Sequence, residues 1–112
     1  MGNFGMEEVV KVFKALADIT RIRIIVYLSL RPRYVCELAD LIGCSQPTIS
    51  RHLQILCEAK IVSCERDGSY VIYSLSPKDE FVKDLLEILM GELKKSNFYR
   101  ELLIDEDGLK RV

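Results

Sequence analysis

Apolar side chains recur at helical spacing along four stretches of the first half of the chain. In residues 6–17, Val9, Val12 and Phe13 share one face of a helix, and basic side chains occupy the other face. The same kind of spacing returns three times before residue 60. It predicts helices over residues 6–17, 20–30, 35–42 and 45–59.

The last two of these helices meet at a tight turn made of Gly43, Cys44 and Ser45. Gly43 suits the position after a helix, because glycine adopts a left-handed backbone conformation at little cost. Ser45 suits the N-cap of the next helix, because its hydroxyl can accept a hydrogen bond from a free backbone N–H group. Two helices joined by so short a turn predict a helix-turn-helix.

A different pattern follows, because β-branched and aromatic residues dominate residues 61–66 and 70–75. Asp67-Gly68 between the two runs is a strong signal for a β-hairpin turn. A hairpin directly after the second helix of a helix-turn-helix forms the wing of a winged helix, here over about residues 61–75. The predicted fold class is therefore a mainly helical winged helix-turn-helix with the element order α-α-α-α-β-β-α.

The helix predicted over residues 45–59 has an apolar stripe of Ile49, Leu53 and Leu56 and a polar opposite face. Arginine pairs with guanine and glutamine with adenine through two hydrogen bonds each, so such a face suits the major groove of DNA. The candidate base-reading residues are Gln46, Thr48, Arg51 and Gln54. The candidate phosphate contacts are Ser45, Ser50 and His52 on this helix, and Arg66 and Ser69 beside the hairpin tip.

The composition fits one domain over residues 1–112, with 49% apolar and 29% charged residues. No apolar run approaches the ~20 residues needed to cross a bilayer, and no signal-peptide pattern is evident, so we expect a cytoplasmic protein without a membrane partner. The net charge of −1 is unevenly distributed: residues 9–66 carry a net charge of +4, and residues 67–112 carry −3. The basic half contains the predicted DNA-binding helix.

The chemistry-bearing residues are four cysteines, Cys36, Cys44, Cys57 and Cys64, and one histidine, His52. No two cysteines have the C-x-x-C spacing of a zinc knuckle, and thiols of a cytosolic protein stay reduced. The chain also lacks a Gly-rich phosphate loop and a second histidine for nucleophilic catalysis. We therefore expect no enzyme.

Two motifs resemble the arsenic-repressor (ArsR/SmtB) family. Residues 15–24, A-L-A-D-I-T-R-I-R-I, resemble that family's A-L-A-D-P-T-R-x-R-I segment. Residues 45–53, S-Q-P-T-I-S-R-H-L, are similar to its S-Q-P-T-V-S-R-H-L recognition helix, and the match extends over about residues 6–95. The resemblance implies a homodimeric winged-helix repressor that binds a palindromic operator in double-stranded DNA. It also implies release of the operator when a metal, a metalloid or a redox signal is sensed.

The sensor motif of that family is only partly present. Arsenic sensors of the family carry C-V-C-D-L where residues 34–38 of this chain read Y-V-C-E-L. The resemblance thus implies Cys36 as the candidate ligand of an effector such as arsenite or another thiophilic metal ion. The family's other metal site, a His/Asp zinc cluster on the last helix, is absent from this sequence, because the one histidine is His52. Redox pairing among Cys44, Cys57 and Cys64, or a non-metal signal, remains an alternative.

A long helix is predicted over about residues 78–103, and it is too apolar for one buried stripe. The first helix has a similar apolar excess, so the first and last helices of two chains can form a twofold dimer that places two recognition helices about one DNA turn apart. The candidate interface residues are Val9, Val12, Phe13, Val82, Leu86, Leu89 and Leu93. The alternatives are a monomer with one large core and a winged helix that binds only protein. Residues 105–112 are polar and expected to fray.

Overall fold

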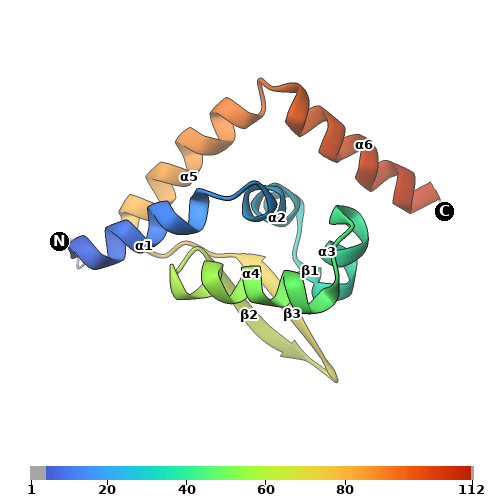
Figure 1. Ribbon diagram of the computed structural model, residues 1–112, viewed down its shortest axis with the longest axis horizontal. Coiled ribbons are helices and arrows are strands. Elements are labelled where there is room, and N and C mark those ends of the chain that lie inside the picture. The colour runs from blue at the N-terminus through green and yellow to red at the C-terminus, as the bar shows by residue number, and fades with distance from the viewer. Residues whose placement is uncertain (1–4, 112) are drawn as a thin grey trace.

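The computed structural model describes residues 5–111 of the chain, with side chains for residues 5–106. Five helices, a two-residue strand and a hairpin precede the C-terminal helix, in the arrangement of a winged helix-turn-helix (Figure 1). The elements are α1 (Met6–Leu16), α2 (Ile19–Leu30), β1 (Arg33–Tyr34), α3 (Val35–Ile42), α4 (Gln46–Glu58), β2 (Val62–Asp67), β3 (Tyr70–Leu75), α5 (Glu80–Leu93) and α6 (Asn97–Arg111).

Helix α2 forms the centre of the molecule. Its residues Ile24, Ile25, Val26 and Tyr27 have no exposed surface, so the helix is buried on nearly all sides. In Figure 1, α5 and α6 lie above α2, whereas α4 and the hairpin lie below it. A helical segment that is apolar on every side, as residues 24–28 are, is stable only when other elements cover it. The core therefore fixes α4 relative to the rest of the chain.

The turn of the helix-turn-helix has the conformation that its sequence predicts. Gly43 ends α3 in the left-handed region, with φ of 82°. The Ser45 hydroxyl then caps α4 by accepting a hydrogen bond from the backbone N–H of Thr48 at 3.3 Å. Pro47 stands in the first turn of α4, where its missing N–H group costs nothing.

The wing is the outer part of a three-stranded antiparallel sheet with the strand order β1-β3-β2. Strands β2 and β3 pair from Val62↔Leu75 to Asp67↔Tyr70. The sequence does not predict the pairing of β1 with β3, because a strand of two residues has no periodicity to recognise. This pairing attaches the start of α3 to the wing.

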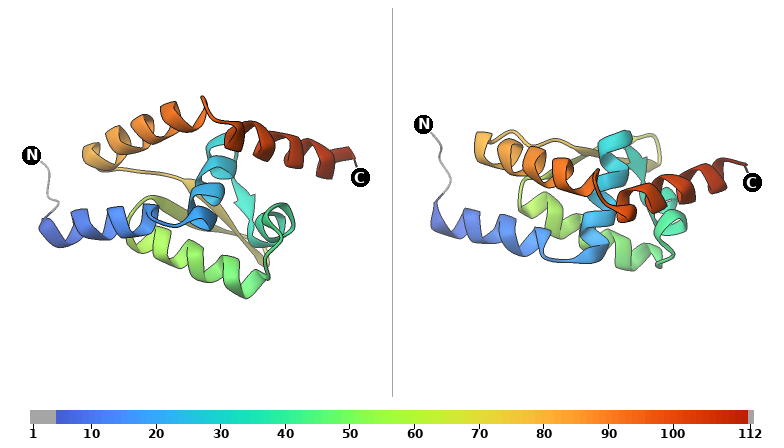
Figure 2. Two further views of the ribbon diagram at one scale, coloured as in Figure 1. Left: turned by 45° about the horizontal axis from the view of Figure 1, so that its top comes forward. Right: turned by 90° about the horizontal axis from the view of Figure 1, so that it is seen from above.

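The expectation of one helix over residues 78–103 is wrong, because the chain turns between α5 and α6. The Ser96 hydroxyl donates a hydrogen bond to the Leu93 carbonyl at 2.6 Å and accepts one from the Tyr99 N–H at 3.4 Å. One side chain thus ends α5 and begins α6. Residues 105–111, expected to fray, are part of α6. Figure 2 shows α1 and the end of α6 at opposite ends of the molecule.

Three of the predicted dimer-interface residues belong to the core of the protomer. Val12 and Val82 have no exposed surface, and Leu86 is 5% exposed. These side chains are part of the protomer's own hydrophobic core and are not available to a partner, which corrects the sequence-based expectation. Within residues 5–111, no helix combines the length and the apolar character that a membrane span requires.

Candidate nucleic-acid interface

The polar face of α4 is exposed, and its apolar stripe is fully buried. Ile49, Leu53 and Leu56 have no exposed surface, so the helix cannot rotate without opening the core. The predicted base-reading residues share the exposed side: Gln46, Thr48, Arg51 and Gln54. Ser45 and Ser50 are the predicted phosphate contacts nearest to them. The arrangement presents rigidly held donors and acceptors that can reach base edges and phosphates.

The N-terminus of α4 is organised by two hydroxyl groups. Besides capping the helix, the Ser45 hydroxyl donates a hydrogen bond to Oγ1 of Thr48 at 2.9 Å. Oγ1 of Thr48 therefore accepts a hydrogen bond from Ser45, and the Thr48 hydroxyl can still donate its own hydrogen bond outward. Free backbone N–H groups and the positive end of the helix dipole at this end favour a phosphate.

His52 lies apart from these residues, on the side of α4 that faces α1 and α2. Its side chain is 19% exposed, and its Nδ1 lies 3.1 Å from Nη1 of Arg21 and 3.9 Å from Oδ2 of Asp18. A guanidinium can only donate, so Nδ1 accepts and the proton of the neutral ring resides on Nε2. Of the predicted phosphate contacts on α4, His52 is thus the one whose side chain binds another helix of the protein.

Arg21 joins the end of α1 to the recognition helix. Its Nε donates to the Ala15 carbonyl at 2.7 Å, and its Nη2 donates to the Lys14 carbonyl at 3.1 Å, while Nη1 binds His52. The backbone N–H of Arg21 also donates to Asp18 at 3.0 Å. This hydrogen bond, followed by the nearby charge of Arg21, holds the pKa of Asp18 below its ordinary value despite some burial.

The tip of the wing is tethered to the start of α3. The Tyr34 hydroxyl donates a hydrogen bond to the carboxylate of Asp67, and the rings of Tyr34 and Tyr70 meet edge to face with centroids 5.7 Å apart. The hydrogen bond to Asp67 raises the pKa of Tyr34. Arg66 and Ser69 are exposed on either side of the turn. The tether limits how far these two side chains can swing.

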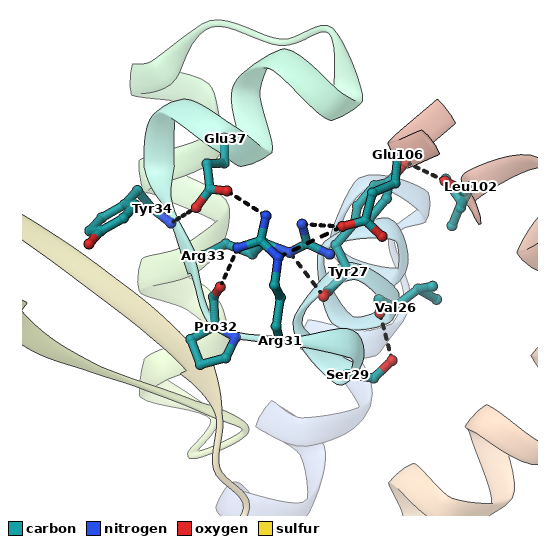
Figure 3. A network of polar contacts seen from close by, with 10 residues as sticks. All are labelled: Val26, Tyr27, Ser29, Arg31, Pro32, Arg33, Tyr34, Glu37, Leu102 and Glu106. Atoms are coloured by element: carbon teal, nitrogen blue, oxygen red, sulfur yellow. Dashed lines mark hydrogen bonds and ion pairs between the residues drawn. The ribbon is translucent and has the colours of Figure 1, made fainter. Parts of the chain in front are cut away.

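A buried ion pair connects α6 to this region (Figure 3). Arg33 is 1% exposed and pairs through Nη1 with Glu106 of α6, while its Nε donates to the Tyr27 carbonyl at 3.2 Å. Beside it, Arg31 donates to Glu37 at 2.8 Å, and Glu37 accepts the backbone N–H of Tyr34 at 3.0 Å.

These contacts form one polar chain from α6 through α3 to the wing tip, by way of Glu106, Arg31, Glu37, Tyr34 and Asp67. Its link between Arg31 and Glu106 is the longest, at 4.0 Å. Because the buried Arg33 also holds Glu106, the position of α6 is coupled to the start of α3.

The four cysteines are separate free thiols. Cys36 and Cys64 are exposed, and Cys44 and Cys57 are half-buried. Burial, reinforced by Cys64, raises the pKa of Cys57, so its thiol is less ionised than an ordinary one. Among the described residues, no group of three or more His, Cys, Asp or Glu side chains is arranged to hold a metal ion.

Comparison with known proteins identifies the family of this chain. The profile of the family described as "Bacterial regulatory protein, arsR family" matches residues 18–63. The chain is 44% identical over 81 residues to the cadmium resistance transcriptional regulatory protein CadC homolog of Staphylococcus aureus, covering 71% of this chain and 65% of that protein. It is 38% identical over 81 residues to the arsenic resistance transcriptional regulator ArsR2 of Pseudomonas putida, covering 70% of each. The chain belongs to the arsR family.

A solved structure has the same fold. The homodimeric winged helix-turn-helix DNA-binding domain Mb0332 of Mycobacterium bovis, a possible ArsR-family regulator, superposes with a TM-score of 0.70 at 26% identity, covering 85% of this chain and 92% of that one. Across three curated relatives, the match spans 58–65% of their own length. Membership in the arsR family agrees with the expectation of a regulatory protein and not an enzyme.

Sequence reasoning missed the residues that hold the interface together. Arg21 lies within the family-like segment of residues 15–24, but its bonds to α1 and His52 depend on the tertiary fold. Tyr34 stands out in the sequence only as the replacement of a family cysteine. Its hydrogen bond to Asp67, 33 positions away, depends on the tertiary fold. No pattern in the neighbouring sequence indicates that the Arg33 side chain is buried.

Proposed function

We propose that this arsR-family protein is a transcriptional repressor that binds a palindromic DNA operator as a homodimer and releases it when an effector binds. The observation that carries the proposal is the exposed face of α4, where Thr48, Arg51 and Gln54 project from a helix whose other side is fully buried. Polar side chains that project from a helix fixed by the core can distinguish base pairs in the major groove. We further propose that the protein acts in the cytoplasm, where the operator is accessible.

Exposed apolar side chains on α1 and α5 support a dimer. Those of α1, called here the α1 stripe, are Met6, Val10 and Phe13, which are 79%, 41% and 52% exposed. On α5, Ile88 is 68% exposed. Contiguous exposed apolar side chains favour association with another surface. Of the residues predicted for the interface, Val9, Phe13, Leu89 and Leu93 remain in the proposal.

The proposed effector is a thiophilic metal or metalloid ion that engages Cys36. Its thiol is exposed in the first turn of α3, two residues after Tyr34. An ion bound there acts on DNA binding if it moves Tyr34 away from Asp67 and so releases the wing. The redox alternative is less well supported, because the raised pKa of Cys57 slows its reaction as a thiolate.

The DNA-binding proposal is tested by replacing Arg51. A duplex is first selected from a random-sequence library with the wild-type protein, and fluorescence anisotropy then compares wild type, Arg51→Ala and Arg100→Ala on that duplex and on an unrelated one. Arg51→Ala is expected to weaken binding to the selected duplex by about 1–3 kcal/mol and to reduce its preference over unrelated DNA.

Arg100→Ala is the matched control, because Arg100 is an exposed arginine of α6, away from the recognition helix. It should leave both affinities unchanged. Equal effects of the two substitutions would contradict base reading by Arg51. If the wild-type protein selects no sequence at all, the alternative of a winged helix that binds only protein is favoured.

A further inference from the structure

A row of basic side chains follows the flank of α4 that faces α1. Lys11 and Lys14 of α1, together with Arg21, line a groove of about 250 Å³ whose other wall includes Ile55 and Glu58 of α4. We propose that this groove is a second nucleic-acid surface, which binds phosphates of the operator backbone beside the major groove that α4 enters. The proposal rests on the DNA-binding function proposed above and adds a contact outside both the helix-turn-helix and the wing.

Lys11 and Lys14 lie on the exposed side of α1 and do not contribute to the hydrophobic core. Val12 and Ala15, each of which directly follows one of them in sequence, are fully buried against the core, whereas Lys11 and Lys14 are exposed. Lys11 is offset from every member of the α1 stripe by more than a quarter turn at 100° per residue. Lys14 is offset from Met6 and Phe13 by about a quarter turn, and it follows Val10 by one helical turn. Neither packing nor the proposed dimer accounts for them.

The charges of the lysines are not balanced inside the protein. Within the described part of the chain, neither the Lys11 nor the Lys14 ammonium group forms an ion pair. Among the described residues that line the groove, Glu58 is the one acidic residue, and together they carry a net charge of +2. Adjacent cations in excess over acidic side chains bind a polyanion favourably, because each phosphate they contact releases condensed counterions.

Arg21 sets the position of this surface relative to the bases. Its guanidinium binds the carbonyls of Lys14 and Ala15 and also His52 of α4, so α1 and the recognition helix move together. A phosphate held by the lysines therefore fixes the register of α4 on the duplex, which is the role of backbone contacts in protein–DNA complexes. Arg21 is a positioning residue in this arrangement, and Lys11 and Lys14 are the phosphate contacts.

The test is the salt dependence of binding to the duplex selected by the wild-type protein. The double variant Lys11→Gln/Lys14→Gln is expected to reduce the slope of log Kd against log salt by about 0.9 for each phosphate that the variant no longer neutralises. The matched control is Lys83→Gln/Lys94→Gln, which removes two exposed lysines from α5 and the turn that follows it. Circular dichroism and sedimentation verify that both variants keep the fold and the oligomeric state of the wild type.

A position-specific measurement separates a direct contact from a general charge effect. Neutral methylphosphonates are placed one at a time along the duplex, and those that weaken the wild-type protein are identified. The double variant should be insensitive to some of these positions, beside the base pairs protected by α4, while the control retains full sensitivity.

An unchanged slope, or equal losses in the two double variants, would overturn the proposal while operator binding by Arg51 still stands. Failure of the wild-type protein to prefer any duplex would overturn the proposed function and this surface with it. The two failures are thus distinguished by the wild-type protein alone.

Discussion

The hydroxyl group of Tyr34 donates a hydrogen bond to the carboxylate of Asp67, and it thereby joins the start of α3 to the tip of the wing. Tyr34 stands where the resemblance to arsenic sensors calls for the first cysteine of a C-V-C-D-L motif. In this chain the position carries a tether instead of a second thiol. The position that would bind the effector in an arsenic sensor is here bonded directly to the wing.

Removing this tether should loosen the wing without unfolding the protein. Tyr34→Phe keeps the ring against Tyr70 but deletes the hydrogen bond to Asp67. We expect faster amide hydrogen exchange in residues 67–70 and a severalfold weaker affinity for the operator, because the wing then pays an ordering cost on binding. Tyr99→Phe on α6 is the control. Unchanged exchange at the hairpin tip would show that the tether does not hold the wing.

The buried pair of Arg33 and Glu106 should be strongly coupled. Glu106→Gln leaves the Arg33 guanidinium buried without its counter-charge, and we expect it to lower the free energy of unfolding by about 3 kcal/mol. The double variant Arg33→Met/Glu106→Leu should recover most of that loss, because no uncompensated charge remains. Urea denaturation of the corresponding single variants and the double variant measures the coupling as a double-mutant cycle. Additive losses would contradict it.

Asp18 should make folding stability depend on pH. Its pKa is held below the ordinary value of 3.8 by the hydrogen bond from the Arg21 N–H, so its contribution is present above the unfolded pKa and is lost as the pH falls through the folded pKa. Asp18→Asn preserves an N-cap and removes the titration, whereas Asp18→Ala should cost about 1 kcal/mol at neutral pH.

The measurement is urea denaturation of the three proteins from neutral pH down into the acid range below the folded pKa of Asp18. The advantage of wild type over Asp18→Asn should disappear at the acid end. A constant difference between these two proteins at every pH would show that the carboxylate of Asp18 is not stabilised by folding.

Replacing Cys36 should separate effector binding from DNA binding. Because the Cys36 side chain is exposed and lies on α3, outside the recognition helix, Cys36→Ser is expected to bind the operator with wild-type affinity. Any release of the wild-type protein by arsenite, measured by anisotropy under reducing conditions, should be lost in this variant. The control is Cys64→Ser, which removes the other exposed thiol. A Cys36→Ser protein that still responds would remove this thiol from the mechanism.

Local sequence signals predict the elements that depend on local physics. Gly43 and Ser45 act on adjacent backbone groups, so the turn can be identified from residue type alone. The break at Ser96 escapes prediction because the apolar spacing continues across it and one serine gives a weak signal. The pattern places Val12 at the dimer interface wrongly, because it shows that a face is buried but not which molecule buries it.

The contacts that organise the site depend on residues distant in the sequence. Tyr27, for example, donates a hydrogen bond at 3.2 Å to the carbonyl of Leu102, 75 positions away. The same holds for Arg21 with His52 and for Arg33 with Glu106, since each pair comes together only after the helices have packed. The spacing of polar and apolar residues predicts which face of a helix is buried. The partner of each polar side chain depends on how the helices pack.

In the function proposed above, two copies of α4 bind a palindromic operator. Selection of duplexes from a random-sequence library, followed by the stoichiometry of the complex on the enriched sequence, tests this proposal. We expect an inverted repeat with half-sites about 10 base pairs apart from centre to centre, bound by two protomers. Recovery of unenriched sequences, or of a single half-site bound by one protomer, would contradict it.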